Sequence, residues 1–183
     1  MALKGKKKNI LNAAVEIARK EGWENVSVRK VSKSIGYSTI KVYSDFGSKE
    51  NLFAAIQKEG FVLLRRKYEA AISTEKTAID TLKLLAMEHV RFSDEHPTYY
   101  ELMFTYKFRE CVAETTKAKR ATGALIAKVI SSMNPKDGRL AFLQFFTLLS
   151  GFVQVHKEFG REDVHPSEQI MEGFVENFVH GIL

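Results

Sequence analysis

Residues 27–52 read SVRKVSKSIGYSTIKVYSDFGSKENL, and this stretch predicts two short helices joined by a tight turn. Val28, Val31 and Ile35 recur at the spacing of one buried helix face. Gly36 follows, and glycine most easily adopts the positive φ that turns a chain after a helix. Such a pair of helices is typical of the helix-turn-helix, whose second helix enters the DNA major groove. A plain helical hairpin gives the same spacing, so both interpretations remain open at this point.

Three serines precede predicted helices as N-cap candidates, because a serine side chain accepts a hydrogen bond from a free backbone N–H. Ser27 precedes the first helix of the pair, and Ser38 precedes the second, which covers Thr39 to about Ser44. Ser48 stands before a longer amphipathic helix.

Composition indicates a globular protein in a reducing compartment. The chain has 183 residues, of which 45% are hydrophobic and 27% charged, enough for one or two domains with a core. A single cysteine, Cys111, excludes an internal disulfide framework and fits the cytoplasm. No apolar run approaches the roughly 18 residues of a membrane span. Asn12 and Glu16 interrupt the apolar run near the amino end, so we do not expect a signal peptide.

The excess of positive charge is confined to the amino end. Residues 1–50 hold eleven Lys and Arg against five Asp and Glu, whereas residues 51–183 hold seventeen of each. A basic segment on an otherwise neutral chain is typical of a protein that binds the phosphate backbone of nucleic acid. A solvated lysine tail without a partner is the alternative. Membrane-surface binding is less favoured, because no segment pairs a lysine face with a long exposed apolar face.

Helical periodicity continues along the whole chain, and no segment alternates like a strand. All three prolines, Pro97, Pro135 and Pro166, lie at predicted helix boundaries. We therefore expect an all-α fold of about nine helices, preceded by a flexible basic arm at 1–8. The predicted helices cover about 9–21, 28–35, 39–44, 48–71, 77–94, 97–108, 110–132, 138–159 and 166–182.

The segment LAFLQFFTLLSGFVQV, residues 140–155, contains no charge and is apolar nearly all round. A helix of this kind is buried on more than one face. In a chain of this size, the additional face indicates packing against a second copy of the protein.

The predicted fifth to eighth helices are rich in aromatic and apolar side chains, which makes an apolar ligand pocket plausible. Plain core packing explains the same pattern, and buried histidines such as His89 are more often hydrogen-bonded core residues than ligand contacts. No HxxxH or CxxC spacing, Gly-rich phosphate loop or nucleophile elbow occurs, so we expect no metal, no cofactor and no catalytic site. The candidate lining residues are Val90, Met103, Phe104, Phe108, Phe145, Leu149, Phe152 and His156.

Residues 10–53, ILNAAVEIARKEGWENVSVRKVSKSIGYSTIKVYSDFGSKENLF, resemble the TetR family of bacterial transcriptional regulators. The resemblance lies in the alanine-rich first helix and in the motifs SVR-x-V, IG-x-S, VY-x-x-F and SKE-x-L, in one register. It implies a three-helix DNA-binding domain at 1–50, joined by a long fourth helix to a helical ligand-binding and dimerisation domain at 51–183. It also implies a homodimer through the last two helices, about 138–159 and 166–182, bound to a double-stranded, roughly palindromic DNA operator.

The same resemblance assigns the DNA contacts. Ser27 and Arg29 open the supporting helix near the backbone, and Lys49 opens the fourth helix, where the dipole favours a phosphate. Thr39 and Lys41 are expected to read bases, although Lys41 could contact phosphate alone. The recognition-helix positions are Tyr37, Ser38, Thr39, Ile40, Lys41, Tyr43 and Ser44.

Two of these positions need comment. Tyr43 is expected to donate its hydroxyl to a phosphate while its ring closes the small core, or to serve the core alone. Family members usually carry a small residue at position 40 followed by Ser or Thr. The isoleucine here could touch a thymine methyl group or hold the helix away from the groove.

The sequence as a whole favours a dimeric repressor that a small, largely apolar or aromatic effector releases from its operator. A DNA-binding regulator without an effector, controlled by a protein partner, is the alternative. From a different class, a helical enzyme or lipid-carrying protein with a coincidental amino-terminal pattern also remains open.

Overall fold

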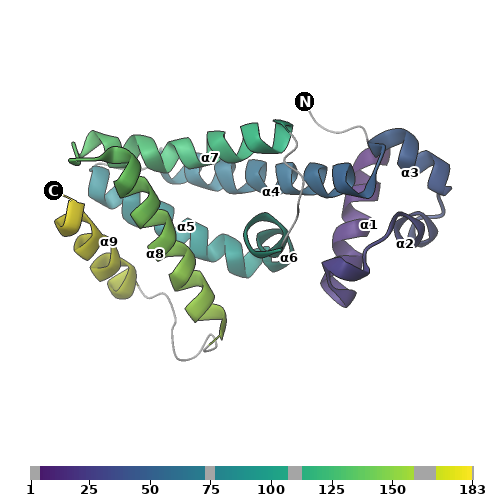
Figure 1. Cartoon of the computed structure of the whole chain (residues 1–183). Helices are drawn as coiled ribbons and strands as arrows, with labels where there is room; N and C mark the ends of the chain where they lie inside the picture. The colour runs from purple at the N-terminus through teal and green to yellow at the C-terminus, as the bar shows by residue number, and fades with distance from the viewer. Residues whose placement is uncertain (1–4, 73–76, 107–112, 159–167, 183) are drawn as a thin grey trace. The chain divides into compact units, whose positions relative to one another are not determined.

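The computed structural model describes residues 5–72, 77–106, 113–158 and 168–182. These residues form nine α-helices, one 3-10 turn and one π-helical turn, and they contain no strand (Figure 1). The all-α prediction of about nine helices is therefore confirmed. The α-helices are α1 Gly5–Glu21, α2 Val28–Ser34, α3 Thr39–Phe46, α4 Lys49–Ile72, α5 Ala78–Glu95, α6 Pro97–Tyr100, α7 Ala113–Ser132, α8 Gly138–Glu158 and α9 Glu168–Ile182.

The chain divides into two compact units. Unit 1 comprises Met1–Phe61 and His96–Lys119, and unit 2 comprises Val62–Glu95 and Arg120–Leu183. The division at 50/51 into a DNA-binding and a ligand-binding domain, expected from the sequence, stays a prediction.

The core of unit 1 is built around Trp23, which lies in the 3-10 turn Trp23–Asn25. Its ring is fully buried and meets the edge of Phe53 at 5.2 Å between ring centroids. Its indole N–H donates to the carbonyl of Thr98 at 3.1 Å, so the buried polar atom is satisfied. The prediction that Trp23 belongs to the core is confirmed. Ile10, Leu11, Ala14, Val31 and Val42 complete the centre of this cluster.

A π-helical turn, Glu101–Thr105, follows α6, where the sequence predicts one continuous helix from Pro97 through Phe108. Gln57 donates to the carbonyl of Leu102 at 2.6 Å, and Leu102 is buried within the unit 1 core. A Cβ atom at Gly60 would collide with the Met103 sulfur, so a side chain at position 60 would require the Met103 side chain to move. Phe108 lies outside the described residues.

The predicted flexible arm at 1–8 is wrong for residues 5–8, because α1 begins at Gly5. Lys7 Nζ donates to the carbonyl of Asp45 at 3.0 Å and lies 5.6 Å from the ring centroid of Phe46. The carboxyl end of α3 attracts a cation through its free carbonyl groups. This tertiary contact orders the start of α1, and residues 1–4 lie outside the described part.

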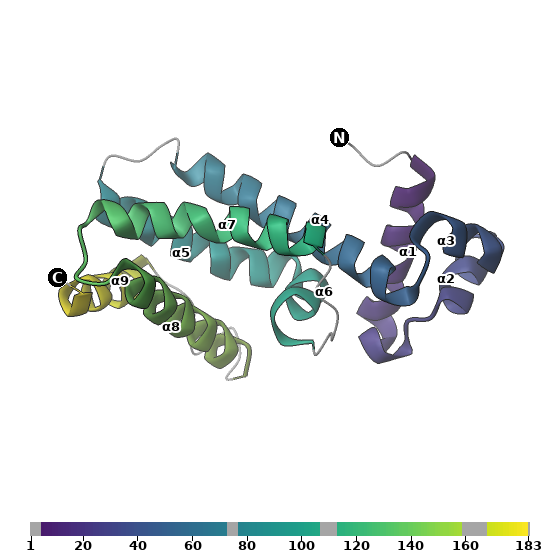
Figure 2. The same cartoon turned by 45° about the horizontal axis from the view of Figure 1, so that its top comes forward.

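Unit 2 contains a three-helix arrangement of α5, α8 and α9, in which α8 and α9 lie side by side (Figure 2). Phe145 of α8 contacts Phe178 and Phe174 of α9, with ring centroids 5.0 and 6.0 Å apart. Lys83 of α5 forms ion pairs with Glu172 at 2.7 Å and Glu176 at 3.2 Å on α9. Aromatic packing and a paired cation therefore hold α9 in place.

Helix α8 buries only one face within the chain, although the sequence predicts burial on more than one. Its length and composition would also allow it to cross a membrane, with a mean hydropathy of 1.3 over 18 residues, 22% of them buried. The sequence analysis considered uninterrupted apolar runs, which stop at polar but uncharged residues such as Gln144 and Thr147, whereas this criterion averages over 18 residues. A core helix of a soluble protein meets the criterion equally.

Two histidines are buried and hydrogen-bonded in unit 2, as the sequence predicts. His89 Nδ1 lies 2.7 Å from the Tyr68 hydroxyl, and both side chains are fully buried. Burial, assisted by the charge of Lys157, lowers the pKa of His89 to about 3. His156 Nε2 lies 3.2 Å from a carboxylate oxygen of Asp94.

We predict that His89 makes stability depend on pH. An unfolded histidine has a pKa of roughly 6.5, so between that pH and about 3 the unfolded chain binds a proton that the folded chain rejects. The His89 contribution is complete above the unfolded pKa and is lost as the pH falls. As the pH falls from 6 to 5, the free energy of unfolding of the wild type should therefore decrease by about 1 kcal/mol more than that of His89→Gln.

Urea unfolding at fixed protein concentration, followed by circular dichroism, measures this slope. His180→Gln, which alters an exposed histidine of α9, is the matched control and should keep the wild-type slope. Equal slopes for the wild type and His89→Gln would contradict the prediction.

Candidate nucleic-acid interface

The helix-turn-helix is built on three serine caps. Ser27 Oγ accepts the backbone N–H of Lys30 at 3.2 Å, and Ser38 Oγ accepts that of Lys41 at 3.2 Å. Ser48 caps the start of α4 in the same way, accepting from Asn51 N at 3.0 Å. All three predicted caps form, so each helix of this region begins where the sequence places it.

Backbone hydrogen bonds close the turn between α2 and α3. Tyr37 N donates to the Ser32 carbonyl at 2.9 Å and Gly36 N donates to the Lys33 carbonyl at 3.4 Å. Together these are the two bonds of a Schellman motif, and Gly36 has the positive φ of 68° that it requires. The turn thereby fixes the angle at which α3 leaves α2.

One face of α3 is buried and the opposite face is open to solvent. Val42 is 1% exposed, whereas Ile40 is 79% and Tyr43 52% exposed. Thr39 and Ser44 are also exposed. We name Thr39, Ile40, Tyr43 and Ser44 the outer face of α3, and all four are among the predicted DNA-contact residues.

The two tyrosines of this region differ. Tyr37 is half-buried and packs against the unit 1 core. Tyr43 is not among the side chains packed against that core, and it is 52% exposed. The exposure of Tyr43 fits the predicted phosphate contact better than the alternative of a core residue.

Lys41 forms an ion pair that the sequence interpretation missed. Its ammonium lies 2.6 Å from the carboxylate of Asp45, one turn further along α3. The signal was present, because opposite charges four residues apart meet on a helix. In this structure the Lys41 ammonium is therefore directed along its own helix.

Other cations of unit 1 divide into paired and unpaired groups. Lys30 pairs with Glu21 at 2.6 Å. Within the described residues, no acidic side chain pairs with Arg29, Lys33 or Lys49. Lys49 Nζ instead lies 5.0 Å from the ring centroid of Phe53, at the amino end of α4. Lys33 is an exposed cation of α2 that the sequence interpretation did not single out.

The predicted ligand-lining residues fall in both units. In unit 2, Phe152 is half-buried and stacks on His156, with ring centroids 6.4 Å apart. In unit 1, Phe104 contacts Phe61 and Tyr100 at 5.6 and 4.7 Å between centroids. Phe108 lies outside the described residues. The predicted residues that are fully buried, or nearly so, are Val90, Met103, Phe145, Leu149 and His156.

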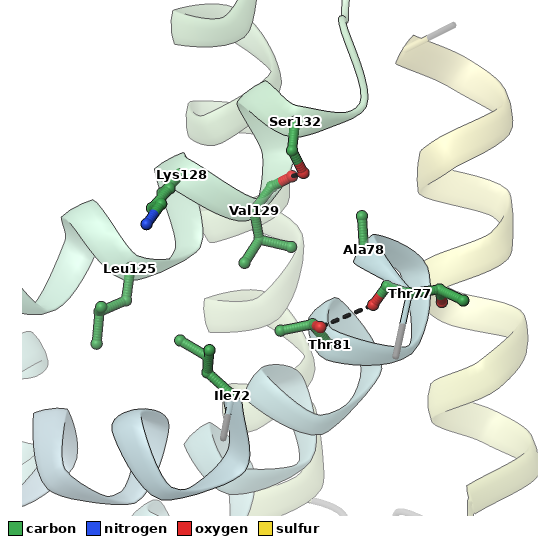
Figure 3. A pocket seen from close by; sticks show the side chains of 8 residues that line it. All are labelled: Ile72, Thr77, Ala78, Thr81, Leu125, Lys128, Val129 and Ser132. Carbon is green, nitrogen blue, oxygen red and sulfur yellow. Dashed lines mark hydrogen bonds between the residues drawn. The ribbon is translucent and has the colours of Figure 1, made fainter. Parts of the chain in front are cut away.

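A pocket of about 380 Å³ opens in unit 2 between the end of α4, the start of α5 and the end of α7 (Figure 3). None of its lining residues is among those predicted, because the prediction looked for aromatic side chains and this wall is aliphatic and hydroxylic. The Thr81 hydroxyl donates to the Thr77 carbonyl at 2.7 Å within the wall. The lining residues are Ile72, Thr77, Ala78, Thr81, Leu125, Lys128, Val129 and Ser132.

Among the residues that the structure describes, no three His, Cys, Asp or Glu side chains gather as a metal site.

Comparisons with known proteins agree with this geometry. The sequence model for bacterial regulatory proteins of the tetR family matches residues 10–56. An uncharacterized HTH-type transcriptional regulator of Mycobacterium tuberculosis is 23% identical over 154 residues, which are 80% of this chain and 68% of that protein.

Two crystal structures share the fold. A bacterial regulatory protein in the tetR family from Rhodococcus RHA1 has a TM-score of 0.77 at 20% identity, covering 98% of both chains. The transcriptional regulator FadR from Bacillus subtilis, solved in complex with stearoyl-CoA, has a TM-score of 0.78 at 18% identity, covering 96% of this chain and 99% of that one. Residues 10–56 therefore match the tetR family of bacterial regulatory proteins, and the chain as a whole shares the fold of these two crystal structures.

Proposed function

We propose that this regulator is a cytoplasmic, dimeric repressor that binds a palindromic operator and leaves it when a small apolar or aromatic effector binds. The observation that carries the proposal is the outer face of α3, which is accessible and lies in the unit that holds the chain's excess positive charge. Phosphate contacts would come from Arg29, Tyr43 and Lys49, and base contacts from the first turn of α3. Such a division of labour is usual, because phosphate contacts position a protein and base contacts specify the sequence.

Dimerisation through about 138–159 and 166–182 is supported by an unsatisfied apolar surface. Leu143 is 51% and Leu148 49% exposed on α8, and Leu140 and Val155 are exposed on the same side of the helix. Ile170 of α9 is also exposed. A helix face that exposes four large apolar side chains among uncharged polar ones favours a second copy of the same chain as its cover.

An apolar effector is supported by the interior of unit 2 and by the fold. The aromatic cluster of α8 and α9 gives this unit an apolar interior, and the pocket at the end of α4 is within the size range of small-molecule sites. FadR of Bacillus subtilis, which shares the fold, was crystallised with stearoyl-CoA. The predicted lining from Val90 to His156 stays part of the proposal.

A regulator without an effector, controlled by a protein partner, is the second candidate. The observation that favours it is the tight filling of the unit 2 core, where Val90, Phe145 and Leu149 are fully buried.

We predict that Tyr43→Phe and Lys49→Ala weaken DNA binding without unfolding the protein, because Tyr43 is half-exposed and Lys49 has no acidic partner in the described chain. Loss of one hydrogen bond to a charged phosphate corresponds to about a tenfold loss of affinity. Lys49→Ala should also reduce the slope of log affinity against log salt by about 1.

Fluorescence anisotropy with duplexes recovered from the protein's own genome by pull-down measures both effects. Lys136→Ala, which removes an exposed lysine of unit 2 outside the pocket, is the control and should bind like the wild type. Unchanged affinity for both Tyr43→Phe and Lys49→Ala would remove the assigned contacts.

We predict that Leu143→Glu combined with Leu148→Glu converts the dimer to a monomer, because each substitution places a carboxylate in the proposed apolar interface. Sedimentation velocity gives the molecular mass directly. Ile79→Glu is the matched control, since Ile79 is exposed on α5, outside α8 and α9. A wild-type protein that is monomeric, or that is recovered with membranes, would contradict the dimer.

We predict that stearoyl-CoA releases the protein from its DNA and that CoA alone does not, because the acyl chain supplies the apolar surface that the effector site would bury. A titration of the protein–DNA complex, followed by anisotropy, distinguishes the two. Release by neither compound would exclude long acyl chains as the effector class.

A further inference from the structure

Ile40 is the most exposed of the large hydrophobic side chains in the described chain, at 79%. It is the second residue of α3, directly after Thr39 and the Ser38 cap. The residues at the amino end of a recognition helix are those that meet base edges when the helix enters the major groove. A branched aliphatic side chain therefore occupies a position that would face base edges.

The orientation of Ile40 is fixed by the rest of the helix. Residues two positions apart on an α-helix are separated by roughly 200° about the helix axis, so Ile40 and Val42 point in nearly opposite directions. Val42 is 1% exposed in the unit 1 core, and the Schellman turn and the Ser38 cap hold the start of α3. Any rotation of the helix that buried Ile40 would expose Val42.

The cations near the start of α3 are either paired or carried by other helices. Lys41 is paired with Asp45 at 2.6 Å and is directed along α3. Arg29, Lys33 and Lys49, which have no acidic partner within the described residues, lie on α2 and at the start of α4. The cations are thus placed to bind phosphates, while the first turn of α3 presents a methyl-bearing side chain and the Thr39 hydroxyl.

Only one base offers an apolar group in the major groove, and that group is the 5-methyl of thymine. Resting on the DNA-binding function proposed above, we propose that Ile40 is a specificity-determining residue that packs on a thymine methyl group in each operator half-site. Burying one methyl group changes an affinity by about fourfold. The contact therefore gives discrimination at one base pair rather than general affinity.

The test uses the full-length protein and duplexes selected by it from a random-sequence library. Each thymine of the selected half-site is replaced in turn by deoxyuridine, which removes only the 5-methyl group. We expect one position at which this replacement weakens binding by about fourfold for the wild type and has no effect for Ile40→Ala. Ile79→Ala, which alters an exposed isoleucine of α5, should keep the wild-type dependence.

Circular dichroism and sedimentation verify that both variants are folded and assembled like the wild type. If DNA is selected but no thymine methyl matters, or if Ile40→Ala retains the dependence, the inference is wrong and the repressor function stands. If Ile40→Ala binds all duplexes more tightly, Ile40 holds the helix away from the groove, and the inference is equally wrong. If no duplex is selected, both proposals fall.

Discussion

The two backbone hydrogen bonds that close the turn at Gly36 constrain the orientation of α3 and therefore which of its faces is accessible. They require a positive φ, which Gly36 supplies without a steric penalty. With the turn closed, Val31 and Val42 are both buried in one cluster, and the opposite side of α3 faces solvent. The packing of Val31 and Val42 therefore determines which face of α3 is accessible. A rotation of α3 that moved a core side chain to the accessible face would break the turn.

Local chemistry made much of the fold predictable. Ser27, Ser38 and Ser48 form the expected caps, because a cap depends on residues at most three positions away. Two of the errors involve distant partners. Lys7 orders the first turn of α1 through a carbonyl 38 residues away, and the π-helical turn after α6 packs where Gly60 leaves room. Neither contact leaves a periodic signal along the chain.

The candidate site was predictable to a similar extent. Helical periodicity separates Val42 from the outer face of α3, and the structure agrees. The Lys41–Asp45 pair was also visible as a spacing of four. The pocket in unit 2 was not predictable, because it depends on where three helices end rather than on which side chains are apolar. A search of the sequence favours aromatic residues as pocket lining. In the structure these residues largely pack against one another, as Phe145 does against Phe178.

The indole of Trp23 has a consequence for observing this protein at work. It is the chain's single tryptophan, and its N–H binds the Thr98 carbonyl in the corner that begins α6. Intrinsic emission excited selectively at the red edge thus originates from one defined location. A shift of that corner away from the first helices would wet the indole and move its emission to longer wavelength. The native protein therefore contains an optical probe of the contact between Trp23 and the start of α6 and needs no added dye.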